Sequence, residues 1–174
     1  MHRAEEDLLV LKAQAGDSRA FGVLYGHYNP PLRRFAFRLC GDEQLAFDAV
    51  QEAWISLTTT LKKLEDPRAF RVWMYRTVRW RITDLVRKRG DVHQPLEEAE
   101  VGSVDESPEL ATSTQLGAHI RLLPDEARVT LVLFYLEEMK LTEIAAVLAV
   151  PVGTVKSRLF RAREHLRQQM SGEE

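Results

Sequence analysis

Cysteine is almost absent from this chain of 174 residues, and no long apolar run occurs in it. The single cysteine, Cys40, cannot form an internal disulfide and cannot supply the paired thiolates of a structural zinc site. No apolar segment approaches the roughly 20 residues that a membrane-spanning helix needs. The N-terminal segment is already charged and therefore lacks the pattern of a secretory signal peptide. These absences predict a cytoplasmic protein that does not insert into a membrane.

Residue groupings that support catalysis are also missing. The five histidines show no metal-ligand spacing relative to one another; they are His2, His27, His93, His119 and His165. There is no glycine-rich loop of the kind that binds phosphate, and no nucleophile beside a base. We therefore expect no enzymatic activity, no metal site and no cofactor.

The net charge is small, at −2, but the charges are unevenly distributed. Arg71 to Arg89 contains seven cations and one acid, and Gly153 to Arg167 contains five cations and one acid. Residues 90–113 carry seven acids and no lysine or arginine. Two basic segments that flank an acidic connector are suited to nucleic acid in spite of the negative total.

The acidic connector has the composition of a linker. It contains glycine, proline and serine and few large apolar residues. We place the domain boundaries accordingly, with a first domain at residues 1–89, a flexible acidic linker at 90–113 and a second domain at 114–174.

Helical periodicity dominates both domains. Apolar residues recur every three or four positions, and no alternating β-branched pattern rises above noise. The predicted fold is therefore all-α, with two small helical domains. Asp17 and Asp42 are expected N-caps, Gly16 and Gly41 are expected stops, and Pro67 lies just before a helix start. The expected helices span residues 5–15, 17–28, 31–40, 42–60, 68–88, 113–122, 125–137, 142–148 and 153–169.

The segment from Leu141 to Arg167 describes two helices joined by a tight turn. The apolar stripes predicted for them are Ile144, Ala145 and Leu148 in the first, and Val155, Leu159, Ala162 and Leu166 in the second. Cations crowd the second helix. A short helix that braces a basic one is the arrangement that places a recognition helix in a DNA major groove.

The face of the second helix opposite its apolar stripe predicts the DNA contacts, since early residues of a recognition helix reach base edges and later ones reach phosphate. The expected base readers are Lys156, Ser157, Phe160 and Arg161, flanked by Thr154. Arg158, Arg163 and Arg167 are expected to contact phosphate or to form intramolecular pairs. The ring of Phe160 suits a thymine methyl group or another subunit, and the alternative is that it packs against a neighbouring helix.

This segment resembles the fourth-region helix-turn-helix of the bacterial extracytoplasmic-function (group 4) RNA polymerase sigma factors. Two positions depart from the family pattern. Lys140 stands where a Ser or Thr N-cap is usual, which breaks the capping box with Glu143. Ala149 stands where the turn usually has Gly, and alanine in a left-handed conformation costs about 1 kcal/mol. Either Thr142 caps a later start, or this turn is less stable than is usual.

The segment from Phe70 to Arg89 interleaves aromatic residues with arginines. Basic residues hold a nucleic-acid backbone and aromatic rings stack on unpaired bases, so this surface suits strand-separated DNA. Aromatic residues at helical spacing also form cores, and we expect a buried stripe of Trp73, Thr77 or Val78, Ile82 and Leu85. Trp80 lies off that stripe and fits either a stacking platform or packing.

The same segment resembles the second region of this family, which melts and reads the minus-10 promoter element. The resemblance implies that the preceding loop, residues 61–68, captures a flipped base. The minus-10 contacts expected on this basis are Lys62, Lys63, Arg68, Arg76, Arg79, Trp80, Arg87, Lys88 and Arg89. The family usually has Asn where Trp80 stands.

The upstream sequence LAFDAVQEAWISL resembles the helix that docks on the β′ clamp of the polymerase. The residues at the matching positions are Asp48, Gln51, Glu52 and Trp54. The first three lie within one helical turn and form an acidic and amide surface suited to a basic coiled-coil partner. A generic solvated face is the alternative.

The leading hypothesis is a promoter-specificity (sigma) subunit of bacterial RNA polymerase. Its expected partners are minus-35 duplex, melted minus-10 DNA and the polymerase core through the β′ clamp and β flap, and an anti-sigma protein is usual in the family. The competing hypothesis is a stand-alone helix-turn-helix regulator that does not dock on core polymerase. Such a regulator needs no aromatic and arginine-rich surface and typically dimerises.

Overall fold

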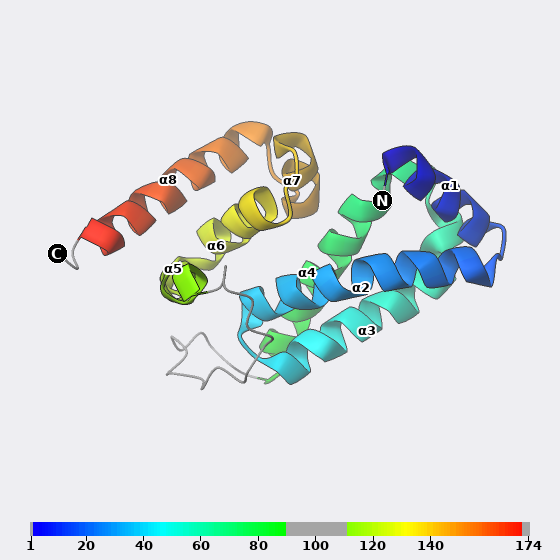
Figure 1. The fold of residues 1–174 in the computed structure, drawn as a ribbon, viewed down its shortest axis with the longest axis horizontal. Helices are drawn as coiled ribbons and strands as arrows, with labels where there is room; N and C mark the ends of the chain where they lie inside the picture. Colours follow the sequence, from blue (N-terminus) through cyan, green and yellow to red (C-terminus); the bar gives the residue numbers. More distant parts are fainter. Residues whose placement is uncertain (1, 90–110, 172–174) are drawn as a thin grey trace. The chain divides into compact units, whose positions relative to one another are not determined.

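The computed structural model describes residues 2–89 and 111–171. Every regular element in these two ranges is helical, as the sequence predicts (Figure 1). The chain divides into two compact units, one containing the helices up to residue 89 and the other most of the helices that follow. The predicted linker lies outside the described residues except for its last three positions, which begin a helix. Within the described ranges no helix is both long enough and apolar enough to cross a bilayer.

The N-terminal unit begins with α1 and α2, and its other helices pack against this pair. Its elements are α1 (Arg3–Gln14), α2 (Ser18–Cys40), α3 (Glu43–Thr60), the 3-10 turns η1 (Leu61–Lys63) and η2 (Pro67–Ala69), and α4 (Phe70–Arg89). Helices α2 and α3 lie side by side, and α4 contacts both of them (Figure 1).

Asp17 and Asp42 cap α2 and α3 as expected. The Asp17 carboxylate accepts hydrogen bonds from the N–H groups of Arg19 and Ala20, and the Asp42 carboxylate accepts one from Leu45. The two glycines that were expected to stop helices adopt left-handed conformations, with φ of 96° at Gly16 and 68° at Gly41.

Helix α2 corrects the sequence-based prediction, because it runs unbroken through Pro30 and Pro31 instead of ending at Tyr28 and restarting. Each proline removes a backbone donor and costs about 3 kcal/mol in a helix interior. The buried face of the helix continues across the interruption with Leu24, Tyr28, Leu32 and Phe35. Burying large side chains of this kind contributes roughly 1.5–3 kcal/mol each, so packing outweighs the two prolines.

The buried stripe of α4 also differs from the expected one. The residues that face the core are Phe70, Met74, Val78 and Ile82, one every four positions. Trp73 and Leu85 are only half-buried at the edges of this stripe. The apolar register is therefore set by Met74 and not by Trp73.

Four α-helices follow in the described residues after position 110, α5 (Ala111–Leu122), α6 (Asp125–Leu131), α7 (Leu141–Leu148) and α8 (Val152–Ser171). A π-helical turn, η4 (Val132–Leu136), follows α6 directly, so the helix predicted to reach residue 137 changes its winding at Val132. Along α8 the side chains of Val155, Leu159 and Ala162 are buried and Leu166 is half-buried, which confirms the predicted stripe.

Candidate nucleic-acid interface

The outward face of α8 carries the residues predicted to read bases. Lys156, Ser157, Phe160 and Arg161 are all exposed, with Phe160 at 64%. The phenyl ring is therefore open to solvent, contrary to the alternative that it packs against a neighbouring helix. Thr154 is half-buried in the first turn, where its carbonyl accepts the Ser157 hydroxyl at 3.0 Å.

Three other arginines of α8 are engaged by side chains of their own unit. Arg158 forms an ion pair with Glu126 of α6. Arg163 Nε donates to the Tyr135 hydroxyl at 2.7 Å, and its guanidinium lies 5.6 Å from the centre of that ring. Arg167 pairs with Glu164 at 2.8 Å. Of the two roles expected for these arginines, the structure shows the intramolecular pairs.

The turn that leads into α8 contains the two unusual positions. Helix α7 begins at Leu141, so Thr142 does not cap it. The N–H of Lys140 donates to Glu143 Oε2 at 2.9 Å, and half of the capping box is thus present. Ala149 has φ of 54° and ψ of 45°, the left-handed conformation that glycine would adopt without strain.

One stripe of α4 points away from the core and unites several of the predicted minus-10 residues. Arg76, Trp80, Thr83 and Arg87 are exposed and follow one another at intervals of three and four residues, which places them on one side of the helix. Trp80 is 56% exposed, and the Arg81 guanidinium lies 4.7 Å from its ring centre. Trp80 is thus available for stacking, whereas Arg79 is half-buried beside the stripe.

The basic C-terminal end of α4 is organised by two carboxylates. Asp84 is only 8% exposed and binds Arg87 and Lys88, each at 2.8 Å. The hydrogen bond from Lys88 is the main cause that lowers the pKa of Asp84. Arg89 pairs with Asp42 at 2.8 Å. The cationic ends of Arg87 and Lys88 remain largely exposed, so these pairs orient them without covering them.

The loop before α4 supplies the remaining predicted cations. Lys62 and Lys63 are exposed on η1. Arg68 forms a bidentate pair with Asp66, with distances of 3.0 Å and 3.1 Å, and the pKa of Asp66 is lowered chiefly by this hydrogen bonding. Arg68 is therefore tied to its own turn more closely than the two lysines.

Gln14, which the sequence analysis did not single out, contacts this loop from α1. Its side chain donates to the carbonyls of Leu61 and Leu64 at 3.0 Å and 2.7 Å. No periodicity or motif marks Gln14, because its partners lie 47 and 50 residues further along the chain.

The predicted polymerase-facing residues of α3 divide into surface and core. Asp48 accepts from Gln44 at 2.9 Å, and Glu52 pairs with Arg81 of α4 at 3.3 Å, while both remain partly exposed. Gln51 is half-buried beside Tyr25.

Trp54 is 4% exposed, with its ring packed against Phe21 and Tyr25. Trp54 therefore packs under the exposed side of α3, and its ring is not available to touch a partner, contrary to the prediction. The exposed side chains of Phe47 and Ile55 share the outward side of α3 and were missed by the sequence analysis.

Comparison of this sequence with known proteins identifies its family. Residues 24–92 match sigma-70 region 2, and residues 113–166 match sigma-70 region 4. The chain is 30% identical to the ECF RNA polymerase sigma factor SigW of Bacillus subtilis over 92% of this chain and 94% of the relative. It is 34% identical to the RNA polymerase sigma-H factor of Pseudomonas aeruginosa, covering 92% and 91% of the two chains. The chain belongs to the extracytoplasmic-function sigma factors.

Solved structures agree on the fold of this sigma factor. CnrH, in complex with the cytosolic domain of CnrY, superimposes with a TM-score of 0.77 at 24% identity over 98% of this chain and 99% of CnrH. The sigma factor RpoE, in complex with the anti-sigma factor NepR from Bartonella quintana, gives 0.69 at 23% identity over 87% and 96%. The match to region 2 begins inside α2 and leaves α1 outside it.

Proposed function

We propose that this sigma factor directs bacterial RNA polymerase to promoters by two separate DNA contacts. The observation that carries the proposal is the presence, in one chain, of an exposed recognition-helix face on α8 and an exposed arginine and tryptophan stripe on α4. A stand-alone regulator needs only the first of these surfaces. The second is chemically suited to unpaired bases, because a tryptophan ring can stack on a base only where that base is unstacked from its neighbours.

At the minus-35 element, the N-terminal half of α8 enters the major groove. Lys156 and Arg161 are both exposed on α8, so their donors can reach base edges. The Phe160 ring lies between them in sequence and is suited to a thymine methyl group. Arg158 and Arg163 hold α8 against α6 and η4 and thereby fix the angle at which the helix is presented.

At the minus-10 element, the stripe of α4 holds melted DNA. Trp80 offers an open ring for stacking, and Arg76 and Arg87 supply charge for the backbone on the same side of the helix. Lys62 and Lys63 extend this charge to the loop that precedes α4.

The polymerase core docks on α3 through Asp48, Gln51 and Glu52, with Phe47 and Ile55 as apolar neighbours. The acidic and amide groups suit a basic helical partner, and the apolar side chains provide area that a purely solvated face would not need. We propose that the protein acts in the cytoplasm and performs no chemistry of its own. We also propose an anti-sigma protein as a partner, since RpoE of the same fold forms a complex with the anti-sigma factor NepR.

The test is binding of a single-stranded minus-10 oligonucleotide, chosen from a random pool with the holoenzyme formed by this protein and core polymerase. We expect binding by the holoenzyme and little by the free protein. Trp80→Ala weakens binding of the oligonucleotide to the holoenzyme by about 1–3 kcal/mol, the free energy of stacking one base on an aromatic ring. Thr83→Ala on the same stripe leaves this binding nearly unchanged. Equal binding without core polymerase would favour the stand-alone regulator.

The docking face is tested separately by gel filtration with core polymerase. Gln51→Ala combined with Glu52→Ala reduces the fraction of sigma factor in the complex, because both changes remove polar groups from the proposed contact. Thr59→Ala, an exposed change elsewhere on α3, serves as control. An unaltered complex with the double variant would remove α3 as the docking helix.

A further inference from the structure

Gln14, at the last position of α1, is hydrogen-bonded to both ends of the short turn η1. Its amide nitrogen donates to the carbonyl of Leu61, which begins η1, and to the carbonyl of Leu64, which follows it. Carbonyl oxygens can only accept, so the nitrogen of this amide has to face them. The two anchored carbonyls flank Lys62 and Lys63.

The loop would be weakly determined without this contact. The end of α3 leaves carbonyl groups with no intrahelical donor, and η1 is a single turn whose cap bond runs from the Leu64 N–H to the Leu61 carbonyl at 3.1 Å. Gln14 supplies a second donor to Leu61 and a donor to Leu64, where the chain leaves the helical conformation. The side chain of Gln14 is half-buried, which shields both bonds from competition by water.

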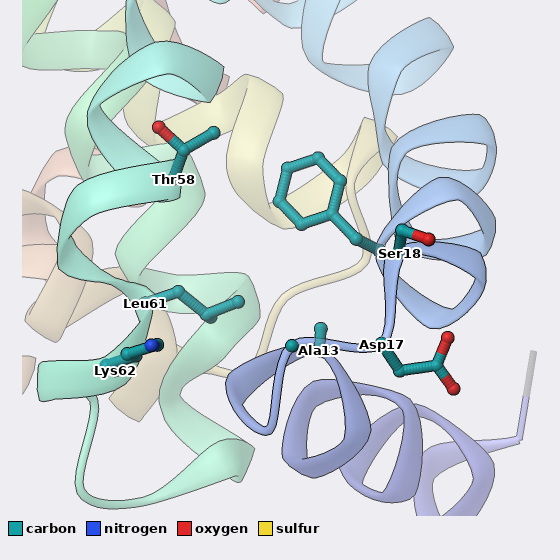
Figure 2. Close-up of a pocket in the computed structure, with 8 residues that line it drawn as sticks. Ala13, Asp17, Ser18, Thr58, Leu61 and Lys62 are labelled. Atoms are coloured by element: carbon teal, nitrogen blue, oxygen red, sulfur yellow. The ribbon is translucent and has the colours of Figure 1, made fainter.

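The same end of α1, together with the start of α2, forms one wall of a pocket whose other wall is the end of α3 and the start of the loop. The pocket has a volume of about 200 Å³. Figure 2 shows Thr58, Leu61 and Lys62 on one side of it and Ala13, Asp17 and Ser18 on the other. Gln14 is covalently adjacent to this second wall, so its two hydrogen bonds tie the two walls together.

We infer that Gln14 is a positioning residue for promoter reading, which fixes the loop bearing Lys62 and Lys63 against α1. The inference rests on the proposed function, because it assigns a role in reading melted DNA to that loop. It goes beyond the family match, since α1 lies outside the residues that correspond to region 2. Helix α1 thereby contributes to the recognition of unpaired bases, by holding the loop that contacts them.

A series of substitutions separates the donor from the bulk of the side chain. Gln14→Met keeps the length and removes the donor, Gln14→Glu replaces the donor by an acceptor, and Gln14→Lys restores a donor. Gln14→Asn, which keeps the amide but is one methylene shorter, replaces the Met variant should that one fail to fold. Gln168→Met, on the exposed part of α8, is the matched control.

Two measurements are made on each variant. The first is amide hydrogen exchange of residues 61–66 in the free protein. The second is base discrimination by the holoenzyme, given by the ratio of its affinities for the selected minus-10 oligonucleotide and for versions with one base replaced. Binding of holoenzyme to a minus-35 duplex is measured alongside.

We expect the Met and Glu variants to exchange faster in the loop and to lose about fivefold in base discrimination, the equivalent of roughly one net hydrogen bond. The Lys variant and the Gln168 control retain the discrimination ratio, and minus-35 binding is unchanged throughout. Faster exchange with an unaltered ratio would overturn the inference by leaving Gln14 a purely structural role. Unaltered exchange would overturn it by showing that the loop is not held.

The proposed function fails in a different way. If Lys62→Ala combined with Lys63→Ala leaves the wild-type affinity of the holoenzyme for the minus-10 oligonucleotide intact, the loop does not contact DNA. Both the loop's part in the minus-10 assignment and the inference built on it are then wrong. If that double variant loses affinity while Gln14→Met keeps the wild-type discrimination ratio, the proposed function stands and only the role of Gln14 is rejected.

Discussion

Lys140 and Glu143 form half of a capping box at the start of α7. The Glu143 carboxylate accepts the N–H of Lys140 at 2.9 Å, but the ammonium of Lys140 has no acceptor with which to bind an N–H of the first turn. In helix α7, which braces the recognition helix, one backbone N–H of the first turn therefore lacks the side-chain acceptor that a complete capping box would supply.

Completing this box stabilises the protein. Lys140→Ser adds an acceptor at the N-cap and is expected to raise the free energy of unfolding by about 1 kcal/mol. Urea unfolding followed by circular dichroism measures the change. Lys140→Ala is the control, because it removes the same ammonium without adding an acceptor. Equal stability of the two variants would mean that the N-cap acceptor contributes nothing here.

Relieving the strained turn has a comparable effect. Ala149→Gly is expected to stabilise the fold by about 1 kcal/mol, since glycine adopts the observed φ of 54° without a Cβ clash. Ala146→Gly, at an exposed position inside α7, is expected to destabilise by about 1 kcal/mol. The opposite signs, read from thermal unfolding, separate a conformational effect from a general effect of glycine.

The recognition helix contains residues of two kinds that mutation distinguishes. Lys156→Ala and Arg161→Ala are expected to weaken binding to a minus-35 duplex by about 1–3 kcal/mol each and to relax base preference. Arg158→Ala is expected to lower the stability of the unit, because it removes the ion pair that joins α8 to Glu126 of α6, while base preference is retained. Competition assays with single-base variants of the duplex test both statements. Unchanged base preference in Lys156→Ala and Arg161→Ala would contradict their assignment as base readers.

The N-cap of α3 makes stability depend on pH in the acidic range. The N–H of Leu45 is the largest cause that holds the pKa of Asp42 below its usual value, with Arg89 adding to it. A carboxylate whose pKa is lowered by folding contributes stability above its unfolded pKa of about 3.9, and this contribution is lost as pH falls through the folded value.

Asp42→Asn isolates this effect, because asparagine also caps helices but does not titrate. The wild-type protein is expected to exceed the variant in stability at pH 6, with the difference shrinking toward pH 2.5. Free energies of unfolding measured across this range provide the check, and a constant difference would contradict the assignment.

Local patterns in the sequence were sufficient for the helix-turn-helix and for the caps at Asp17 and Asp42, because each rests on residues within one or two turns of one another. Helix α2 was misjudged at Pro30 and Pro31, since local propensity says nothing of the buried face that continues across them. Packing between distant segments decided this element.

Individual roles within the candidate site were harder to predict than the site itself. Arg76, Trp80 and Arg87, which are exposed on α4, were among the predicted residues, but the inward register passes through Met74 where Trp73 was expected. Trp54 is buried in the core, although it was expected to face the polymerase. The role of Gln14 could not be predicted from local sequence, because its hydrogen-bond partners lie about fifty residues away. Packing against distant segments and long-range hydrogen bonds decide such roles, and spacing along one helix does not show which segments will be its neighbours.

Helix α8 carries five cations between Lys156 and Arg167, but three of them are held within their own unit: Arg158 by Glu126, Arg163 by Tyr135 and Arg167 by Glu164. A cation that neutralises a DNA phosphate releases counterions, which makes binding sensitive to salt. For each phosphate neutralised, the logarithm of the binding constant falls by about 0.9 when the salt concentration rises tenfold. Only Arg158 and Arg167 are paired with carboxylates, because the Tyr135 hydroxyl that binds Arg163 is neutral. The ionic-strength dependence that α8 contributes should therefore correspond to at most three phosphates and not to five, so promoter recognition by this helix withstands rising salt better than its sequence suggests.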